Sequence, residues 1–142
     1  MKITLKRQDD AFHLLATNEL GKEVHIDAGP ALGGHNLGAR PMELLIMGLG
    51  GCSSIDVISI LKKFRQNLED IQVTIDAERE AGVEPSLFTT IHAHYSLTGN
   101  LDKDKVERAL ALSIDKYCSV ARVLEKTAKI TYTYEILPGV SK

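Results

Sequence analysis

Two cysteines, Cys52 and Cys118, are the residues of this 142-residue chain that could carry redox chemistry. A cysteine thiolate can attack the O–O bond of a peroxide, and the resulting sulfenic acid can condense with a second thiol to form a disulfide. In a reducing compartment, a cysteine pair more often serves metal or redox chemistry than a permanent disulfide. A lone buried cysteine, however, is commonly just a small hydrophobic residue. The residue types alone leave a purely structural role open for both.

The segment from Arg40 to Lys63, RPMELLIMGLGGCSSIDVISILKK, is expected to position Cys52. Pro41 suits the first position of a helix, and the residues that follow are nearly all apolar or small. A helix that is apolar on all sides is buried on all sides. The segment is about as long as a membrane span, but glycines, serines and Asp56 interrupt the apolar run. It therefore predicts a core helix rather than a membrane helix.

Gly48, Gly50 and Gly51 lie just before Cys52. Each glycine costs a helix interior roughly 1 kcal/mol relative to alanine. Glycines at such positions allow another backbone to approach closely, here that of a second helix or of a partner chain. The sequence thus predicts that Cys52 lies where two backbones meet.

The second cysteine lies between two further predicted helices. Asp102 is expected to cap the first of these, and Ser119 to cap a short one that follows. Cys118 would then lie near a helix N-terminus, where the helix dipole favours a thiolate. Arg122, one turn later, could add positive charge there.

The remaining segments predict an α+β fold in a single domain covering residues 1–142. Alternating apolar residues predict an antiparallel meander from residues 2–6, 11–17 and 24–27, and further strands over 71–77, 87–98 and 130–136. A glycine-rich connection over 29–38 has no periodicity, and loops of this length are often functional. The order of strands and helices is typical of an α+β protein.

Other chemistries have less support. His92 and His94 share one strand face, but no third ligand is evident, so we expect surface residues and predict no metal site and no cofactor. A net charge of −2 and the absence of tryptophan argue against nucleic-acid binding. The charged start MKITLKRQDD is unlike a signal peptide, so we expect a cytoplasmic protein that does not bind membranes.

Two motifs in order, PMELLIMGLGGCSSIDV and DKYCSVARVLEKT, followed by an alternating strand, resemble the OsmC/Ohr family of thiol-dependent hydroperoxide reductases. The likeness extends over nearly the whole chain and is greatest to the OsmC-like subgroup that carries PMEL and GGC. The resemblance implies an OsmC-like fold, in which antiparallel sheets wrap around long buried central helices. It also implies an intertwined homodimer with active sites at the subunit interface.

By this resemblance, Cys52 corresponds to the peroxidatic cysteine and Cys118 to the resolving one, and both should lie within disulfide reach. The resemblance implies that the chain reduces organic hydroperoxides in oxidative or osmotic stress. This would be a peroxiredoxin-type activity, with an external dithiol as the reductant.

Family members place an activating arginine before the central helix, and a glutamate directly after the proline. Here Arg40 is the nearest arginine, with Arg122 and Lys22 as alternatives, and Glu43 is the nearest acid. A second hypothesis is a non-catalytic protein that binds an apolar small molecule in the interface pocket, and a third makes both cysteines structural.

Overall fold

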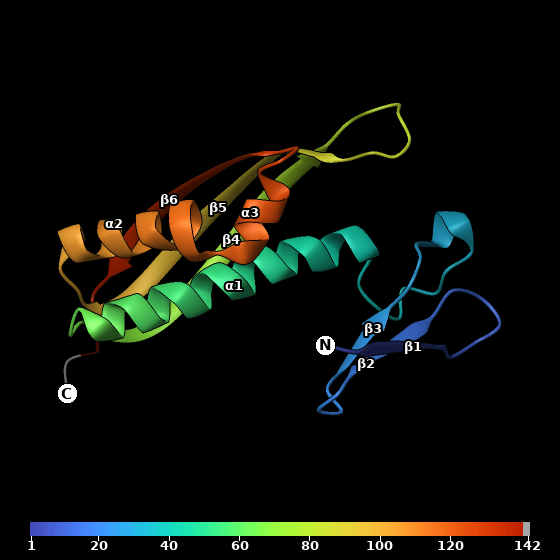
Figure 1. Cartoon of the computed structure of the whole chain (residues 1–142), viewed down its shortest axis with the longest axis horizontal. Helices are drawn as coiled ribbons and strands as arrows, with labels where there is room; N and C mark the ends of the chain where they lie inside the picture. The colour runs from blue at the N-terminus through green and yellow to red at the C-terminus, as the bar shows by residue number, and fades with distance from the viewer. Residues whose placement is uncertain (141–142) are drawn as a thin grey trace. The chain divides into compact units, whose positions relative to one another are not determined.

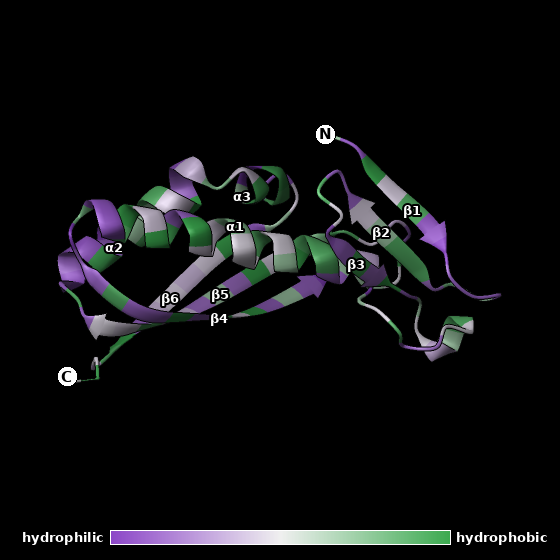
Figure 2. Cartoon of the chain, turned by 90° about the horizontal axis from the view of Figure 1, so that it is seen from below, coloured by the Kyte–Doolittle hydropathy of each residue, from purple (hydrophilic) through white to green (hydrophobic). Residues whose placement is uncertain are grey.

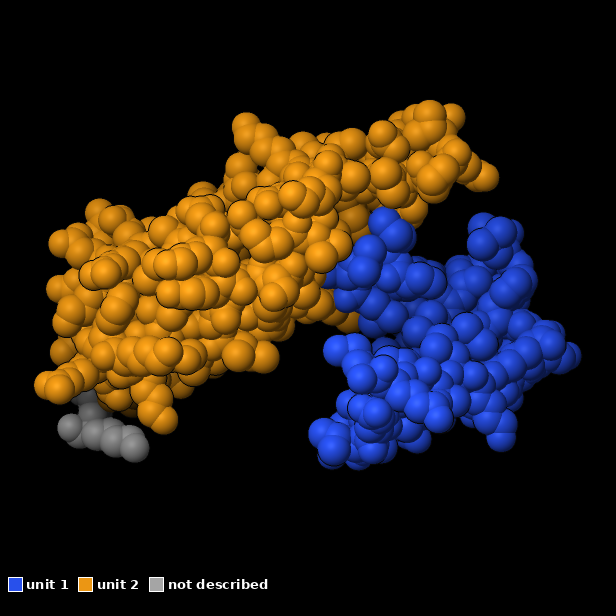
Figure 3. All heavy atoms as spheres, in the orientation of Figure 1, with its two compact units in different colours: residues 1–45 blue, residues 46–142 orange. Residues whose placement is uncertain are grey.

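The computed structural model of the chain describes residues 1–140. It divides into two compact units, Met1–Leu45 and Ile46–Lys142, which Figure 3 distinguishes by colour. Helix α1 (Pro41–Lys63) begins at the end of the first unit and continues into the second. The predicted α+β fold is confirmed, with two three-stranded sheets and one long helix.

The first unit contains the predicted antiparallel meander. Its strands are β1 (Ile3–Arg7), β2 (Leu14–Asn18) and β3 (Glu23–Ile26), in the order β1-β2-β3 (Figure 1). The side chain of Asn18 accepts hydrogen bonds from the backbone N–H groups of Leu20 and Lys22, both at 2.9 Å. These bonds close the tight turn between β2 and β3.

The glycine-rich connection after β3 is organised by a buried carboxylate. Asp27 accepts hydrogen bonds from the backbone N–H groups of Ala28, His35 and Leu37, at 2.7, 3.1 and 3.0 Å. These N–H groups, that of Leu37 above all, hold the pKa of Asp27 below its ordinary value. The connection also contains a short helix, η1 (Pro30–Leu32). The loop is therefore ordered by its own hydrogen bonds.

The second unit packs its helices on one face of a sheet. The strands are β4 (Asn67–Arg79), β5 (Phe88–Asn100) and β6 (Lys129–Leu137), and helices α1 and α2 (Lys103–Leu112) cover the same face (Figure 2). Strands β4 and β5 are antiparallel, but β5 and β6 are parallel. The sheet is thus mixed rather than purely antiparallel, because the helices between β5 and β6 return the chain in the same direction.

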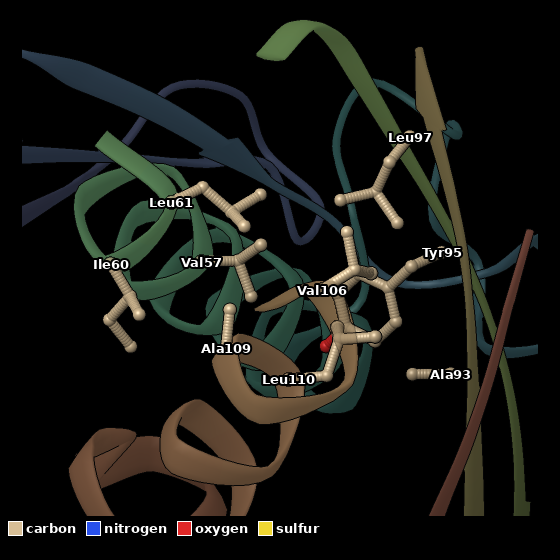
Figure 4. Close-up of a cluster of buried hydrophobic side chains, with 9 residues drawn as sticks. All are labelled: Val57, Ile60, Leu61, Ala93, Tyr95, Leu97, Val106, Ala109 and Leu110. Carbon is tan, nitrogen blue, oxygen red and sulfur yellow. The ribbon is translucent and has the colours of Figure 1, made fainter. Parts of the chain in front are cut away.

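The core of this unit joins three elements. Its centre contains Val57, Ile60 and Leu61 of α1, Ala93, Tyr95 and Leu97 of β5, and Val106, Ala109 and Leu110 of α2 (Figure 4). Asp102 caps α2 as predicted, since its side chain accepts a hydrogen bond from the Lys105 backbone N–H at 3.0 Å. The core therefore fixes α1 against the sheet and α2, which sets the position of the cysteine-bearing face.

The prediction that α1 is buried on all sides holds for only part of its circumference in the single chain. Met47, Ile55 and Ile58 are 58%, 69% and 44% exposed. Among the described residues, no atom comes within 4 Å of where a Gly51 Cβ would lie. We name the face formed by Met47, Gly51, Ile55 and Ile58 the α1 stripe. These residues are three or four positions apart and so share one side of the helix.

Helix α1 is also long and apolar enough to cross a membrane, by length and composition alone. The core helix of a folded domain meets the same criterion. Because Val57, Ile60 and Leu61 pack in such a core, the contacts of α1 are those of a core helix with one uncovered side.

We expect the Tyr95→Phe substitution to destabilise the second unit. The Tyr95 hydroxyl donates to Ser53 Oγ at 2.7 Å, and both residues are buried. Loss of this bond leaves Ser53 with a buried acceptor unpaired and costs about 1 kcal/mol. The melting temperature should fall by about 3–6 °C, as measured by circular dichroism. Tyr117→Phe, at a residue that is 52% exposed, is the control, and an unchanged melting temperature in Tyr95→Phe would refute the expectation.

A candidate thiol active site

Helix α1 carries the first cysteine on a half-buried face. Cys52 is partly accessible, and Asp56, one turn later on the same face, is also half-buried. The three glycines do not break the helix, which runs without interruption from Pro41 to Lys63. A methyl group on Gly50 would lie 3.3 Å from Ile75 Cδ1 of β4. At Gly50, α1 therefore comes close to a side chain of the sheet, whereas the predicted close approach of a second helix or of a partner chain stays a prediction.

Cys118 lies close to Cys52 and Asp56, although it belongs to a later segment of the second unit. After α2, the chain forms one turn of π-helix, η2 (Ser113–Tyr117), and Cys118 is then the N-cap of α3 (Ser119–Leu124). The predicted cap residue, Ser119, is therefore wrong by one position. The Sγ atom of Cys118 accepts a hydrogen bond from the Ala121 backbone N–H at 3.4 Å. Such π-turns are frequent at functional sites.

The two thiols and one carboxylate meet. The Sγ atoms of Cys52 and Cys118 and a carboxylate oxygen of Asp56 all lie within 4.8 Å of one another. The predicted proximity of the two cysteines is confirmed, and both are free thiols. Since a disulfide requires an S–S distance of about 2.05 Å, a modest local movement would join them.

Sequence reasoning noted Asp56 only as a charge that interrupts the apolar run. The signal that could have marked it is its spacing, because residues four apart on a helix share a face. This signal has meaning only once Cys118 is known to face the same turn of α1.

A buried polar layer lies beneath the site. Ser113 Oγ shares its proton between the Ser53 carbonyl oxygen at 3.1 Å and Asp56 Oδ2 at 3.3 Å. Ser53 in turn receives the Tyr95 hydroxyl. These contacts connect η2, α1 and β5, and they help to fix the orientation of the Asp56 carboxylate toward the thiols.

The two thiols differ in environment. Burial is the main cause that raises the pKa of the Cys118 thiol to about 11. The hydrogen bond from the Ala121 backbone N–H acts to lower this pKa, and the neighbouring Cys52 thiol acts to raise it. Cys118 is therefore a neutral thiol at pH 7. The sequence predicted that a helix N-terminus would favour its thiolate, but burial outweighs the dipole of this six-residue helix. Cys52 is the more accessible of the two sulfurs.

Arg122 lies in the same unit but is already paired. Its guanidinium donates to the Ile114 carbonyl oxygen at 2.9 Å and lies 2.8 Å from Glu125 Oε2. Its Nε is buried, and none of the described residues accepts a hydrogen bond from it. The charge of Arg122 is thus largely balanced by Glu125.

The other predicted site residues lie in the first unit, where each has its own role. Arg40 donates from its guanidinium to the carbonyl oxygens of Asp27 and Gly38, at 3.3 and 3.0 Å, and to Asn36 Oδ1. Glu43 accepts the Arg40 backbone N–H at 2.8 Å, which is one half of a capping box at the start of α1. A role for either residue at Cys52 stays a prediction, and so does one for Lys22.

His92 and His94 lie on the exposed face of the second sheet. Both nitrogens of His92 lie near threonine hydroxyls, 2.7 Å from Thr131 and 3.0 Å from Thr133. His94 Nδ1 lies 2.8 Å from the Thr133 hydroxyl. These contacts agree with the expectation that the two histidines are surface residues of the sheet.

An apolar groove of about 470 Å³ lies between α1 and β4. It is lined mainly by Met47, Gly50 and Gly51 of α1 and by Ile71, Val73 and Ile75 of β4. Met47 and Gly51 also belong to the α1 stripe, so the groove and the stripe form one continuous apolar surface.

Comparison with known proteins identifies the family and the fold of the chain. A family model described as OsmC-like protein matches residues 34–133. Protein YhfA of Escherichia coli K12 is 50% identical over 98 residues, which are 68% of this chain and 72% of YhfA. The solved structures that share the fold include proteins from Aquifex aeolicus and Legionella pneumophila.

A hypothetical protein from Aquifex aeolicus VF5 superposes with a TM-score of 0.78 at 30% identity, covering 95% of this chain and 96% of that one. An organic hydroperoxide resistance protein, OsmC, from Legionella pneumophila gives a TM-score of 0.70 at 17% identity, over 95% and 97% of the two chains. At 17% identity, the second likeness concerns the fold alone.

Proposed function

The chain belongs to the OsmC family, and from this premise we propose that it is a thiol-dependent peroxidase that reduces organic hydroperoxides. The observation that carries the proposal is the thiol pair, with one accessible and one buried sulfur within 4.8 Å. A likeness in fold to a protein described as an organic hydroperoxide resistance protein agrees with it.

Cys52 is the proposed nucleophile because its sulfur is the accessible one. Its thiolate attacks the distal peroxide oxygen, so that an S–O bond forms, the O–O bond breaks and the alkoxide leaves as an alcohol after protonation. The product is the Cys52 sulfenic acid. By the family resemblance, Arg40 is the proposed cation that favours the thiolate, and Glu43, which accepts the Arg40 backbone N–H, is its proposed partner.

Cys118 is the proposed resolving thiol. Its sulfur attacks Cys52, the S–S bond forms and the S–O bond breaks, and the Cys118 proton and the departing hydroxide become water. An external dithiol then reduces the disulfide by exchange. A reducing cytoplasm, which keeps such a pair reduced at rest, is the proposed location.

The resolving step requires a proton acceptor, and we assign this role to Asp56. Its carboxylate lies within 4.8 Å of both sulfurs and can take the Cys118 proton and pass it to the departing hydroxide. A positioned acid–base group typically contributes a hundredfold or more. We therefore expect Asp56→Asn to slow disulfide formation about a hundredfold at pH 7, while sulfenic acid formation at Cys52 changes little.

The pH dependence of the Asp56→Asn variant has a definite sign. Because burial raises the pKa of Cys118 to about 11, its thiolate fraction increases with pH throughout the range below that value. The rate of disulfide formation in the variant should rise about tenfold per pH unit between pH 7 and 10. Single-turnover stopped-flow kinetics can measure both steps, with Asp115→Asn on η2 as the control. Equal rates in the two variants would contradict the role of Asp56.

We also propose that the active form is a homodimer. The α1 stripe and the adjoining groove are apolar and uncovered in the single chain, and helix faces of this kind are normally buried. Gly51 has open space around it, which would suit the close approach of a second α1. The interface would be large and apolar, as in obligate dimers.

The direct test of the function is steady-state reduction of cumene hydroperoxide, compared with hydrogen peroxide, in the presence of a dithiol. We expect turnover of both, with higher kcat/KM for the organic hydroperoxide because of the apolar surroundings. Turnover of neither would favour the second candidate, a protein that binds an apolar small molecule in the groove between α1 and β4. The apolar lining of that groove is the observation that supports this alternative.

A further inference from the structure

The carboxylate of Asp56 is the least balanced charge near the thiols. It is half-buried, and its recorded polar contact is the shared proton of Ser113 at 3.3 Å. Among residues 1–140, it takes part in none of the ion pairs. A half-buried anion of this kind is costly unless it is paired or coordinates a metal.

We propose that Asp56 and the reduced thiols of Cys52 and Cys118 bind one Zn²⁺ ion per chain. The proposal goes beyond the peroxidase function and does not depend on turnover of any peroxide. It also departs from the expectation, drawn from the sequence, that the chain has no metal site. That expectation did not consider Asp56 as a ligand.

The distances suit a tetrahedral ion. With Zn–S bonds of about 2.3 Å, two sulfur ligands in a tetrahedral site are separated by about 3.8 Å. The three ligand atoms already lie within 4.8 Å of one another, so at most about 1 Å must be closed. Two ligands come from adjacent turns of one helix, and the third from the N-cap of α3. The fourth position is left for water or an exogenous ligand.

The chemical types of the three ligands favour Zn²⁺ over other divalent ions. Two sulfurs and one carboxylate form a mixed set, whereas Mg²⁺ and Ca²⁺ prefer oxygen ligands alone. Zn²⁺ is bound by cysteine and by aspartate in tetrahedral geometry. Of the divalent ions common in proteins, zinc therefore fits this set best.

The groups around the ligands match those that support metal sites. Outer hydrogen bonds orient metal ligands and tune their basicity. Here the Ala121 backbone N–H donates to Cys118 Sγ at 3.4 Å, and Ser113 Oγ donates to Asp56 Oδ2. Two of the three proposed ligands thus have a hydrogen-bond donor that orients them.

Binding of zinc releases the protons of the thiol ligands. The S–H bonds of Cys52 and Cys118 break as the two S–Zn bonds form, and the protons go to solvent, because a coordinating thiol is deprotonated outright by the metal. Coordination lowers the nucleophilicity of a thiolate sulfur, because the sulfur donates electron density to the metal. Zinc should therefore protect Cys52 from hydroperoxide, which would make the metal an inhibitor of the reduced protein.

The test is an anaerobic titration of the reduced full chain with Co²⁺, followed by absorption. We expect a near-ultraviolet thiolate-to-cobalt charge-transfer band that saturates at one equivalent and disappears when Zn²⁺ is added. Asp56→Asn should weaken cobalt binding at least tenfold, and Cys52→Ser should remove most of the band. Asp115→Asn, a control at an exposed carboxylate on η2, should leave it unchanged.

Two results would overturn the proposal. One is the absence of the band at one equivalent in the wild-type protein, which needs no variant to interpret. The other is equal cobalt affinity in Asp56→Asn and Asp115→Asn, since the site would then lack its carboxylate ligand. The titration contains no peroxide, so failure of the proposed peroxidase function would leave its outcome unaffected.

Discussion

Replacement of Cys52 by serine is expected to lower kcat/KM for cumene hydroperoxide by at least about a thousandfold, because it removes the attacking sulfur itself. Serine is nearly isosteric and keeps the half-buried face of α1 filled. Cys118→Ser should instead allow the first oxidation and stop the second, so that the Cys52 sulfenic acid accumulates. Trapping with a sulfenic-acid reagent and mass spectrometry would distinguish these two states.

The asymmetry between the two variants is the important result. The structure motivates it by giving Cys52 the accessible sulfur and Cys118 the buried one. Asp115→Asn, at an exposed site near Cys118 in sequence, should retain both oxidations and serves as the control. Equal loss of the first oxidation in Cys52→Ser and Cys118→Ser would mean that the assigned roles are wrong.

The second large effect is expected at the α1 stripe. Ile55 is 69% exposed in the single chain and would be buried in the proposed dimer. Ile55→Asp places one unpaired carboxylate in the interface for each subunit, at a cost of several kcal/mol. The dimer dissociation constant should therefore increase at least about a thousandfold. Sedimentation velocity at micromolar concentration should show a dimer for the wild type and a monomer for the variant.

A matched control is available on the turn between β4 and β5. Val83 is 50% exposed and lies outside the stripe, so Val83→Asp should leave the dimer intact. A wild-type protein that sediments as a stable folded monomer would contradict the proposed assembly. So would an Ile55→Asp variant that remains fully dimeric.

The sequence predicted the long elements well because their patterns are strong. The apolar run from Arg40 to Lys63 corresponds to α1 within one residue, and the alternation over 87–98 corresponds to β5 with small shifts at its ends. Local periodicity does not determine strand direction, however. The parallel pairing of β5 with β6 depends on how α2, η2 and α3 cross the sheet, which the alternating pattern does not contain.

The site was predictable in part. A family resemblance indicated that Cys52 and Cys118 would be close, and they are. Asp56 was missed because its role depends on Cys118 facing the same turn of α1, a contact distant in sequence. The single-residue error at the cap of α3 has a local cause. Directly after the π-turn η2, the Cys118 sulfur accepts the Ala121 backbone N–H and takes the place usually filled by a serine hydroxyl.

The uncovered side of α1 has a similar explanation. Composition indicates that an apolar helix needs cover on every side. It does not say whether that cover comes from the same chain or from another. In the single chain, the core contacts of Val57 and Leu61 cover one side, while Ile55 and Ile58 stay exposed.

The disulfide between Cys52 and Cys118 can be detected after a single turnover with hydroperoxide. The fully reduced wild-type protein is treated with one equivalent of cumene hydroperoxide, alkylated, digested and examined by mass spectrometry. We expect loss of both free thiols and a disulfide that joins the Cys52 and Cys118 peptides, with one equivalent of alcohol formed. Two thiols that remain fully alkylated, with the hydroperoxide unconsumed, would contradict the claim that this pair reduces organic hydroperoxides.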